Sequence, residues 1–145
     1  MCIFVKKSGK DFYHEHVKEA LIKDGWCISH DPYYLNIETS APLEIDLGAE
    51  KLISAEKDLE KIVVEVKSFL NRSLTYDFHT AYGQFRIYRR GILKNDPERV
   101  LYLALSKDVF SELQQRNFYM ELISDESINL LVFDPLSKTI EKWIK

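Results

Sequence analysis

The sequence predicts an α/β fold in which helices flank a mixed central sheet. Three observations predict it. The chain has 145 residues, of which 46% are apolar, and this is enough for one domain with a substantial core. A β-branched and almost continuously apolar run at 61–68 is typical of a central strand covered on both faces. Helical and strand patterns then alternate through the second half of the chain.

The first half of the chain predicts one helix followed by strands. Residues 11–25 have helical spacing, with Asp11 as the N-cap and Gly25 as the residue that ends the helix. Residues 1–10 are then a loose leader. The strand patterns after this helix lie at 26–30, at 43–56 (one strand or two) and at 61–68, with a polar turn at 57–60.

The second half of the chain predicts alternating helices and strands. The pattern is a helix from Ser73 to about Arg90, a buried strand at 99–105, a helix at 107–118, a buried strand at 128–134 and an edge strand at 139–144. No internal repeat and no linker interrupts this order. We therefore expect a single domain over residues 1–145.

The net charge is −3 and the pI about 5.8, which is not the composition of a general polyanion binder. The charge is uneven along the chain, however. Residues 31–65 carry nine acidic and three basic side chains, whereas residues 66–100 carry seven basic and three acidic ones. This gradient reflects either chance and solvated faces, or a carboxylate site flanked by cations, which suits a metal ion and a phosphate together.

The sequence also indicates a location. The longest wholly apolar run, at 100–105, has six residues, whereas a membrane span needs roughly twenty. The apolar stretch near Met1 is too short for a signal peptide. Cys2 and Cys27 lack metal-ligand spacing, and we expect free thiols in a reducing compartment. The chain is therefore expected to be cytoplasmic and to have no membrane partner.

The most informative feature is a pair of charges inside the most apolar strand. Glu65 and Lys67 are two residues apart, so both side chains lie on one face of the strand. One interpretation is a solvated face on which the two side chains pair with each other. The other is a functional site, because a buried charge is costly unless it is paired or bound to a metal.

A second carboxylate favours the functional interpretation. Asp46 lies between Ile45 and Leu47 in the preceding strand pattern, and a hairpin brings it close to Glu65. Two such carboxylates, with the backbone carbonyl of Val66, bind a hard cation such as Mg2+. Lys67 beside the ion then orients a water and offsets charge on a phosphorane-like transition state.

The helix predicted from Ser73 adds polar residues. Gln84 and Tyr88 are four residues apart and share one helix face. Three arginines, Arg86, Arg89 and Arg90, lie close by. They indicate either contacts with DNA phosphates or only the solvated side of a helix with an aromatic core stripe.

The set Asp46, Glu65-Val66-Lys67 and Gln84-x-x-x-Tyr88 resembles the PD-(D/E)XK nuclease superfamily, the restriction-endonuclease-like fold. That resemblance implies a three-layer fold with the core order helix, three strands, helix, strand. It implies that Asp46 and Glu65 bind Mg2+ or Mn2+, that Lys67 and Gln84 are catalytic and that Tyr88 supports them. Ile45 stands where the motif has a proline.

Glu19 in the first helix resembles the helix glutamate that many nucleases of this fold place near the metal. It is therefore a further candidate ligand. The alternative is a solvent-facing glutamate paired with Lys23.

A longer resemblance covers nearly the whole chain. The stretches ALIKDGW, IDLGAEKLISAEK, KIVVEVKSF, RVLYLAL and LVFDP are similar to the XisH family of cyanobacterial proteins. These are named as controlling factors for excision of a DNA element. The resemblance implies a nuclease-like protein acting on DNA, and the likeness to nucleases of this fold implies a homodimer. The alternative that it implies is a non-catalytic regulatory factor acting through a recombinase and a small XisI-type partner.

Other polar and aromatic residues are expected to be structural. His14 and His16 point about 200° apart on a helix, so they cannot share one metal ion and are expected at the surface. His79 is expected to pack or to lie at the surface. Tyr33 and Tyr34 are expected to pack a loop, with stacking on bases as the alternative.

Overall fold

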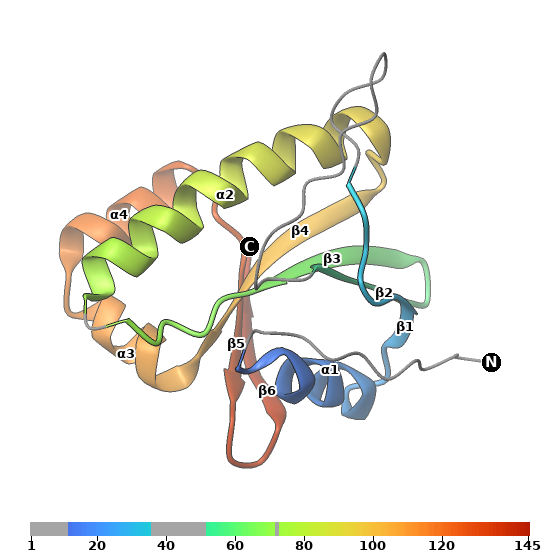
Figure 1. Cartoon of the computed structure of the whole chain (residues 1–145), viewed down its shortest axis with the longest axis horizontal. Helices are drawn as coiled ribbons and strands as arrows, with labels where there is room; N and C mark the ends of the chain where they lie inside the picture. Colours follow the sequence, from blue (N-terminus) through green and yellow to red (C-terminus); the bar gives the residue numbers. More distant parts are fainter. Residues whose placement is uncertain (1–11, 36–51, 72) are drawn as a thin grey trace.

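The structure is a computed structural model that describes residues 12–35, 52–71 and 73–145 (Figure 1). Ten elements follow one another in the described residues. They are α1 (His14–Lys23), β1 (Cys27–His30), β2 (Leu52–Lys57), β3 (Glu60–Val66), α2 (Leu74–Asn95), β4 (Arg99–Ser106), α3 (Lys107–Gln114), α4 (Asn117–Asp125), β5 (Leu130–Asp134) and β6 (Thr139–Ile144). The core order helix, three strands, helix, strand is therefore the predicted one.

The six strands form one open sheet in the order β1-β2-β3-β4-β5-β6. The pairs β1–β2, β2–β3 and β5–β6 are antiparallel, whereas β3–β4 and β4–β5 are parallel. As a result β1, β3, β4 and β5 all end on the same side of the sheet, which we call the carboxyl end. In open α/β sheets, ligands bind outside this end.

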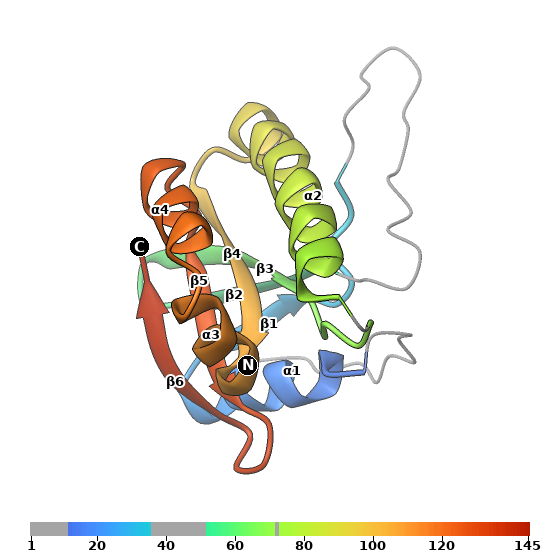
Figure 2. The same ribbon diagram turned by 90° about the vertical axis from the view of Figure 1, so that its left-hand side faces the viewer.

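Helices cover both faces of the sheet (Figure 2). On one face, Val17 and Leu21 of α1 pack with alternate residues of β3: Ile62, Val64 and Val66. On the other face, α2, α3 and α4 supply the aromatic and aliphatic side chains that pack on Val63 of β3 and on the central strands. The prediction of an α/β three-layer fold with a mixed central sheet is confirmed.

The central strand β3 forms where the sequence predicts it, because its β-branched residues suit a pleated surface buried on both faces. Alternation places Glu65 on the same face as Val63, toward α2. The side chain of Glu65 is 0% exposed.

The helix predicted at 107–118 is shorter than expected, and a further helix, α4, follows it that was not predicted beyond residue 118. Helix α3 ends at Gln114, where the N–H groups of Gln115 and Arg116 bond to the carbonyls of Glu112 and Leu113 in a tight turn. Helix α4 then begins at Asn117. Leu113 and Tyr119 both pack in the core on this face of the sheet, although they belong to different helices.

Other boundaries shift modestly. Helix α1 begins at His14 after Tyr13, and Asp11, the expected N-cap, lies outside the described residues. Gly25 follows the helix with a φ of +94°, the left-handed conformation that ends helices, as predicted. Helix α2 runs on to Asn95. The leader at 1–10 and most of the strand pattern at 43–56 also lie outside the described residues.

The prediction of free thiols is wrong for Cys27, which is disulfide-bonded. Cys2, the other cysteine of the sequence, lies outside the described residues.

Over the ranges that the structure describes, none of the helices combines the length and apolar character needed to cross a membrane.

Candidate functional site

Glu65 lies near the carboxyl end of the sheet, between two neighbouring strands. Its Cα pairs with Leu52 of β2 on one side and with Leu103 of β4 on the other. The carboxylate is thus fully buried in the middle of the sheet, on the face that α2 covers. This excludes the solvated-face interpretation for Glu65.

Lys67 follows β3 directly and keeps the strand's direction. Its N–H donates to the carbonyl of Ala104 at 3.2 Å, which extends the pairing of β3 with β4 by one residue. Alternation therefore places the Lys67 side chain on the same face as Glu65, where it is half-buried. A buried carboxylate and a lysine thus share one face at the carboxyl end.

Helix α2 brings the next two predicted residues to that face. Tyr88 is 3% exposed and belongs to the core between α2 and the sheet, together with Val63. Gln84, one turn earlier, is half-buried. The structure thus places Glu65, Lys67, Gln84 and Tyr88 on one side of the sheet.

The two other side chains predicted to bind the metal are Asp46 and Glu19. Asp46 lies outside the described residues. Glu19 lies on α1, which covers the opposite face, and its half-exposed carboxylate faces Lys23 at 3.7 Å and Lys138 at 3.8 Å. This is the solvent-facing arrangement weighed for Glu19 as the alternative to metal binding.

Two of the three predicted DNA-binding arginines hold helices together. The guanidinium of Arg86 forms an ion pair with Glu126 just after α4. Arg89 donates to the carbonyls of Ser127 at 2.6 Å and Glu126 at 3.1 Å. These bonds satisfy carbonyls beyond the end of α4 and dock α2 on it. Arg90 is exposed.

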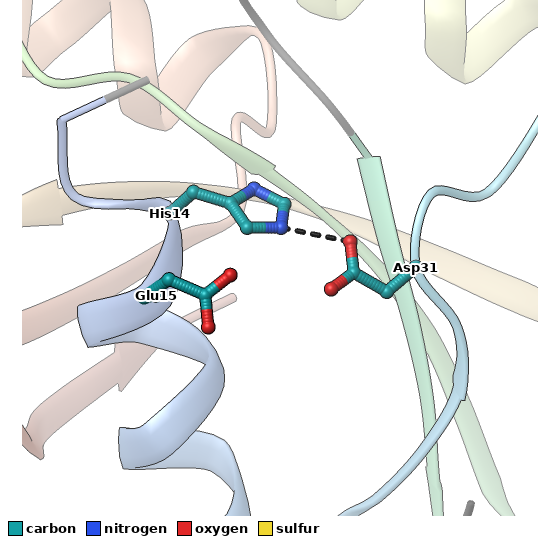
Figure 3. Close-up of side chains that lie close together, drawn as sticks. All are labelled: His14, Glu15 and Asp31. Atoms are coloured by element: carbon teal, nitrogen blue, oxygen red, sulfur yellow. Dashed lines mark hydrogen bonds and ion pairs between the residues drawn. The ribbon is translucent and has the colours of Figure 1, made fainter. Parts of the chain in front are cut away.

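Sequence reasoning missed a buried polar cluster between α1 and the end of β1 (Figure 3). The His14 Nε2–H donates to Oδ1 of Asp31 at 2.8 Å, and the Lys18 ammonium forms an ion pair with Oδ2 of the same carboxylate. All three side chains are at most 3% exposed. The surface position expected for His14 is therefore wrong.

Burial by itself would raise the pKa of Asp31. Hydrogen bonds from His14 and Lys18, together with their charges, outweigh this effect and lower the pKa below its ordinary value. Asp31 is therefore a carboxylate at neutral pH. The signal in the sequence was the spacing of His14 and Lys18, four residues apart on one helix face, but Asp31 comes 13 residues later.

This cluster is close to the end of β3. The N–H of Tyr13 donates to Oγ of Ser68 at 3.1 Å, so the start of α1 is bonded to the residue that follows Lys67. Asp31 directly follows β1, and β1 runs parallel to β3. Both groups of polar residues therefore lie at the carboxyl end of the sheet, on its two faces.

His79 and Tyr33, which were expected to be structural, both make packing contacts. His79 Nε2 and the Tyr119 hydroxyl are 2.8 Å apart, which links α2 to α4. Tyr33 donates to Asp96 at 3.1 Å, and burial, with that bond, raises the pKa of Tyr33 to about 12. Tyr33 therefore packs its loop, as expected, whereas Tyr34 is exposed.

Comparison with known proteins places the chain in a family. The family model described as XisH protein matches residues 7–141. A solved structure of a fdxN element excision controlling factor protein from Anabaena variabilis is 42% identical, with 92% of this chain and 98% of that one covered and a TM-score of 0.82. A solved XisH family protein from Nostoc punctiforme PCC 73102 is 41% identical, with 93% and 100% covered and a TM-score of 0.83.

No curated protein matches the sequence. The family match nevertheless spans nearly the whole chain, and both solved structures share its fold at more than 40% identity. The chain belongs to the XisH family.

Proposed function

We propose that this protein is a metal-dependent nuclease that acts on DNA during the excision of a DNA element. The observation that carries the proposal is the pair Glu65 and Lys67. A fully buried carboxylate and a half-buried lysine share one face of a central strand, at the carboxyl end of the sheet. The similar Anabaena variabilis protein, named an element excision controlling factor, supports the link to excision.

The donor chemistry fits a hard cation. A carboxylate oxygen is the ligand that Mg2+ prefers, and a cation compensates the cost of burying the charge of Glu65. In the proposed site, Glu65, Asp46 and the backbone carbonyl of Val66 hold Mg2+ or Mn2+. The bound ion supplies a Lewis acid and a water of lowered pKa.

The remaining roles belong to the chain itself. Lys67 orients the attacking water and offsets negative charge on the phosphate in the transition state. Gln84 orders the site from α2, and Tyr88, buried in the core, holds that part of α2 against the sheet. The proposed reaction is hydrolysis of a phosphodiester bond in DNA.

A cleavage assay tests this proposal. Branched, nicked and linear DNA are each incubated with the wild-type protein and Mg2+ or Mn2+. We expect cleavage that is lost in Lys67→Ala and Asp46→Ala, by about 100-fold or more, because each variant removes a transition-state contact or a metal ligand. Lys145→Ala is the matched control and should cleave normally, because it removes an exposed positive charge near the start of β3, at the opposite end of that strand from Lys67.

The second candidate is a non-catalytic regulatory factor that acts through a recombinase and a small XisI-type partner. Two observations favour it. Arg86 and Arg89 are already engaged with the end of α4, and the net charge of −3 disfavours strong unaided DNA binding. Wild-type protein that cleaves none of the DNAs but retains the small partner in a pull-down would support this candidate over the nuclease.

The resemblance to nucleases also implies a homodimer, which suits two DNA strands. Sedimentation velocity on the purified protein tests that expectation.

A further inference from the structure

Glu15 lies beside the buried cluster of His14, Lys18 and Asp31. One ligand atom each of His14, Glu15 and Asp31 lie within 4.8 Å of one another. Figure 3 shows the Glu15 carboxylate beside the His14 ring, on the side that also faces Asp31. These three residues are separate from the set that contains Glu65 and Lys67, because α1 covers the other face of the sheet.

The distances suit a coordination sphere. His14 Nε2 and Asp31 Oδ1 are 2.8 Å apart. Metal–nitrogen and metal–oxygen bonds of about 2.0–2.2 Å place neighbouring ligands about 3.0–3.5 Å apart. His14 and Asp31 therefore need to separate only slightly to hold one ion, and the exposed Glu15 side chain closes on it from the solvent side.

The surroundings organise the ligands. The Lys18 ammonium occupies Oδ2 of Asp31, which leaves Oδ1 directed at His14. Such hydrogen bonds to the far oxygen of a carboxylate are typical of metal sites. With the imidazole in the neutral form that binds a metal, the two carboxylates and the ammonium carry a net charge of −1, which attracts a divalent cation.

We propose that His14, Glu15 and Asp31 bind a divalent transition-metal ion, of which Mn2+ and Zn2+ are the best-suited examples. A mixed set of one imidazole and two carboxylates suits these ions, whereas Mg2+ prefers oxygen ligands alone. The ion takes the place of the proton between Nε2 and Asp31. This site is additional to the one in the proposed nuclease function and does not depend on it.

The proposal also predicts how tightly the ion binds. A metal on Nε2 leaves the imidazole proton on Nδ1, which is buried and has no hydrogen-bond partner among the residues that the structure describes. Metal-bound histidines normally donate that proton to a partner, and losing the partner weakens binding by about 10–100-fold. The affinity is therefore expected to be moderate.

The direct test uses untagged wild-type protein and Mn2+ alone. Pulsed electron paramagnetic resonance should detect the nitrogen of a coordinated imidazole. In isothermal titration, Glu15→Gln should weaken Mn2+ binding by about tenfold or more, because it removes a charged ligand. Glu15 is exposed, so this variant should keep its fold, and circular dichroism checks that it does.

Matched variants identify the ligands. His14→Gln should abolish the nitrogen signal, whereas His16→Gln, on the same helix, should retain it. Glu112→Gln, which removes an exposed carboxylate from α3, should leave Mn2+ affinity unchanged.

Three results would overturn the inference. They are the absence of a nitrogen signal in wild type, unchanged Mn2+ affinity in Glu15→Gln, and binding that is lost in Glu65→Gln alone. The last result would assign the ion to the proposed nuclease site and leave that proposal standing. Conversely, nitrogen-coordinated Mn2+ in a protein that cleaves no DNA would support the present inference while the nuclease proposal failed.

Discussion

At the scale of single residues, the molecule places several charges where water cannot reach them. Lys18 and Asp31 form an ion pair in which both side chains are almost fully buried. Such a pair gives little net stability compared with apolar residues, but removing one partner leaves a buried charge uncompensated. The pair therefore ties α1 to the residue that follows β1.

Asp31→Asn should destabilise the fold by about 3–5 kcal/mol, because the ammonium of Lys18 loses its carboxylate in a buried setting. Urea denaturation measures the free energy of unfolding. The control is Glu98→Gln, which breaks the exposed pair with Lys61 and should cost less than about 1 kcal/mol. Equal effects of the two substitutions would contradict the structural role of the buried pair.

The sequence predicted the relative positions of residues that are close along the chain better than it predicted contacts between residues that only the fold brings together. Glu65 and Lys67 were identified because their spacing of two puts them on one strand face, and the structure has that arrangement. The contact of His14 with Asp31 was missed, because it depends on how α1 packs against β1. Arg86 and Arg89 looked available for DNA, since their partners after α4 are about 40 positions away.

At the scale of elements, helix boundaries depend on bonds that periodicity does not contain. Helix α2 begins after Ser73, whose hydroxyl accepts the N–H of Tyr76 at 3.0 Å. The start predicted from apolar spacing, Ser73, is the residue that caps the helix, and a serine at this position is a local signal of a helix start. The break between α3 and α4 has no such signal at Gln115 or Arg116, so the predicted helix ran past the end of α3 and most of α4 was not predicted.

Ser73→Ala should cost about 1 kcal/mol, since it removes the side-chain acceptor for an otherwise unpaired N–H in the first turn of α2. Thermal denaturation followed by circular dichroism provides the measurement. Ser111→Ala, an exposed change inside α3, is the matched control and should leave stability unchanged or slightly raise it. A loss of the same size in both variants would argue against the capping role.

Two arginines of α2 should have different roles, Arg89 in stability and Arg90 in DNA binding. Arg89→Ala should lower stability by about 1–2 kcal/mol, because it frees two carbonyls beyond α4. Arg90→Ala should leave stability unchanged and weaken DNA binding, with a smaller salt slope of the affinity. Urea denaturation and fluorescence anisotropy on labelled DNA measure the two effects. Full DNA affinity in Arg90→Ala would remove Arg90 from the proposed interface.

At the scale of the whole molecule, the strand order predicts which strands are the most stable. Strands β3 and β4 are paired on both sides and covered on both faces, whereas β1 and β6 have one paired side. The alternation of helices and strands was enough to predict this mixed sheet. The segment at 36–51, which contains Asp46, lies outside the described residues, so the hairpin expected to bring Asp46 to Glu65 stays a prediction.

Amide hydrogen exchange should be slowest in β3 and β4, for example at Val63 and Leu103, and should there approach the rate set by global unfolding. The amides of β1 and β6 should exchange faster through local opening. Nuclear magnetic resonance or mass spectrometry resolves the strands. Equal protection across all six strands would mean that the sheet opens only as one unit.

The two tryptophans give the protein a built-in optical probe. Trp26, between α1 and β1, and Trp143, in β6, are the two tryptophans of the sequence. Their rings lie 5.6 Å apart, although β1 and β6 form opposite edges of the sheet. Intrinsic fluorescence therefore reports whether the first helix and the last strand are together. A shift in emission before the loss of helical circular dichroism would reveal separation of the chain ends as an early step of unfolding.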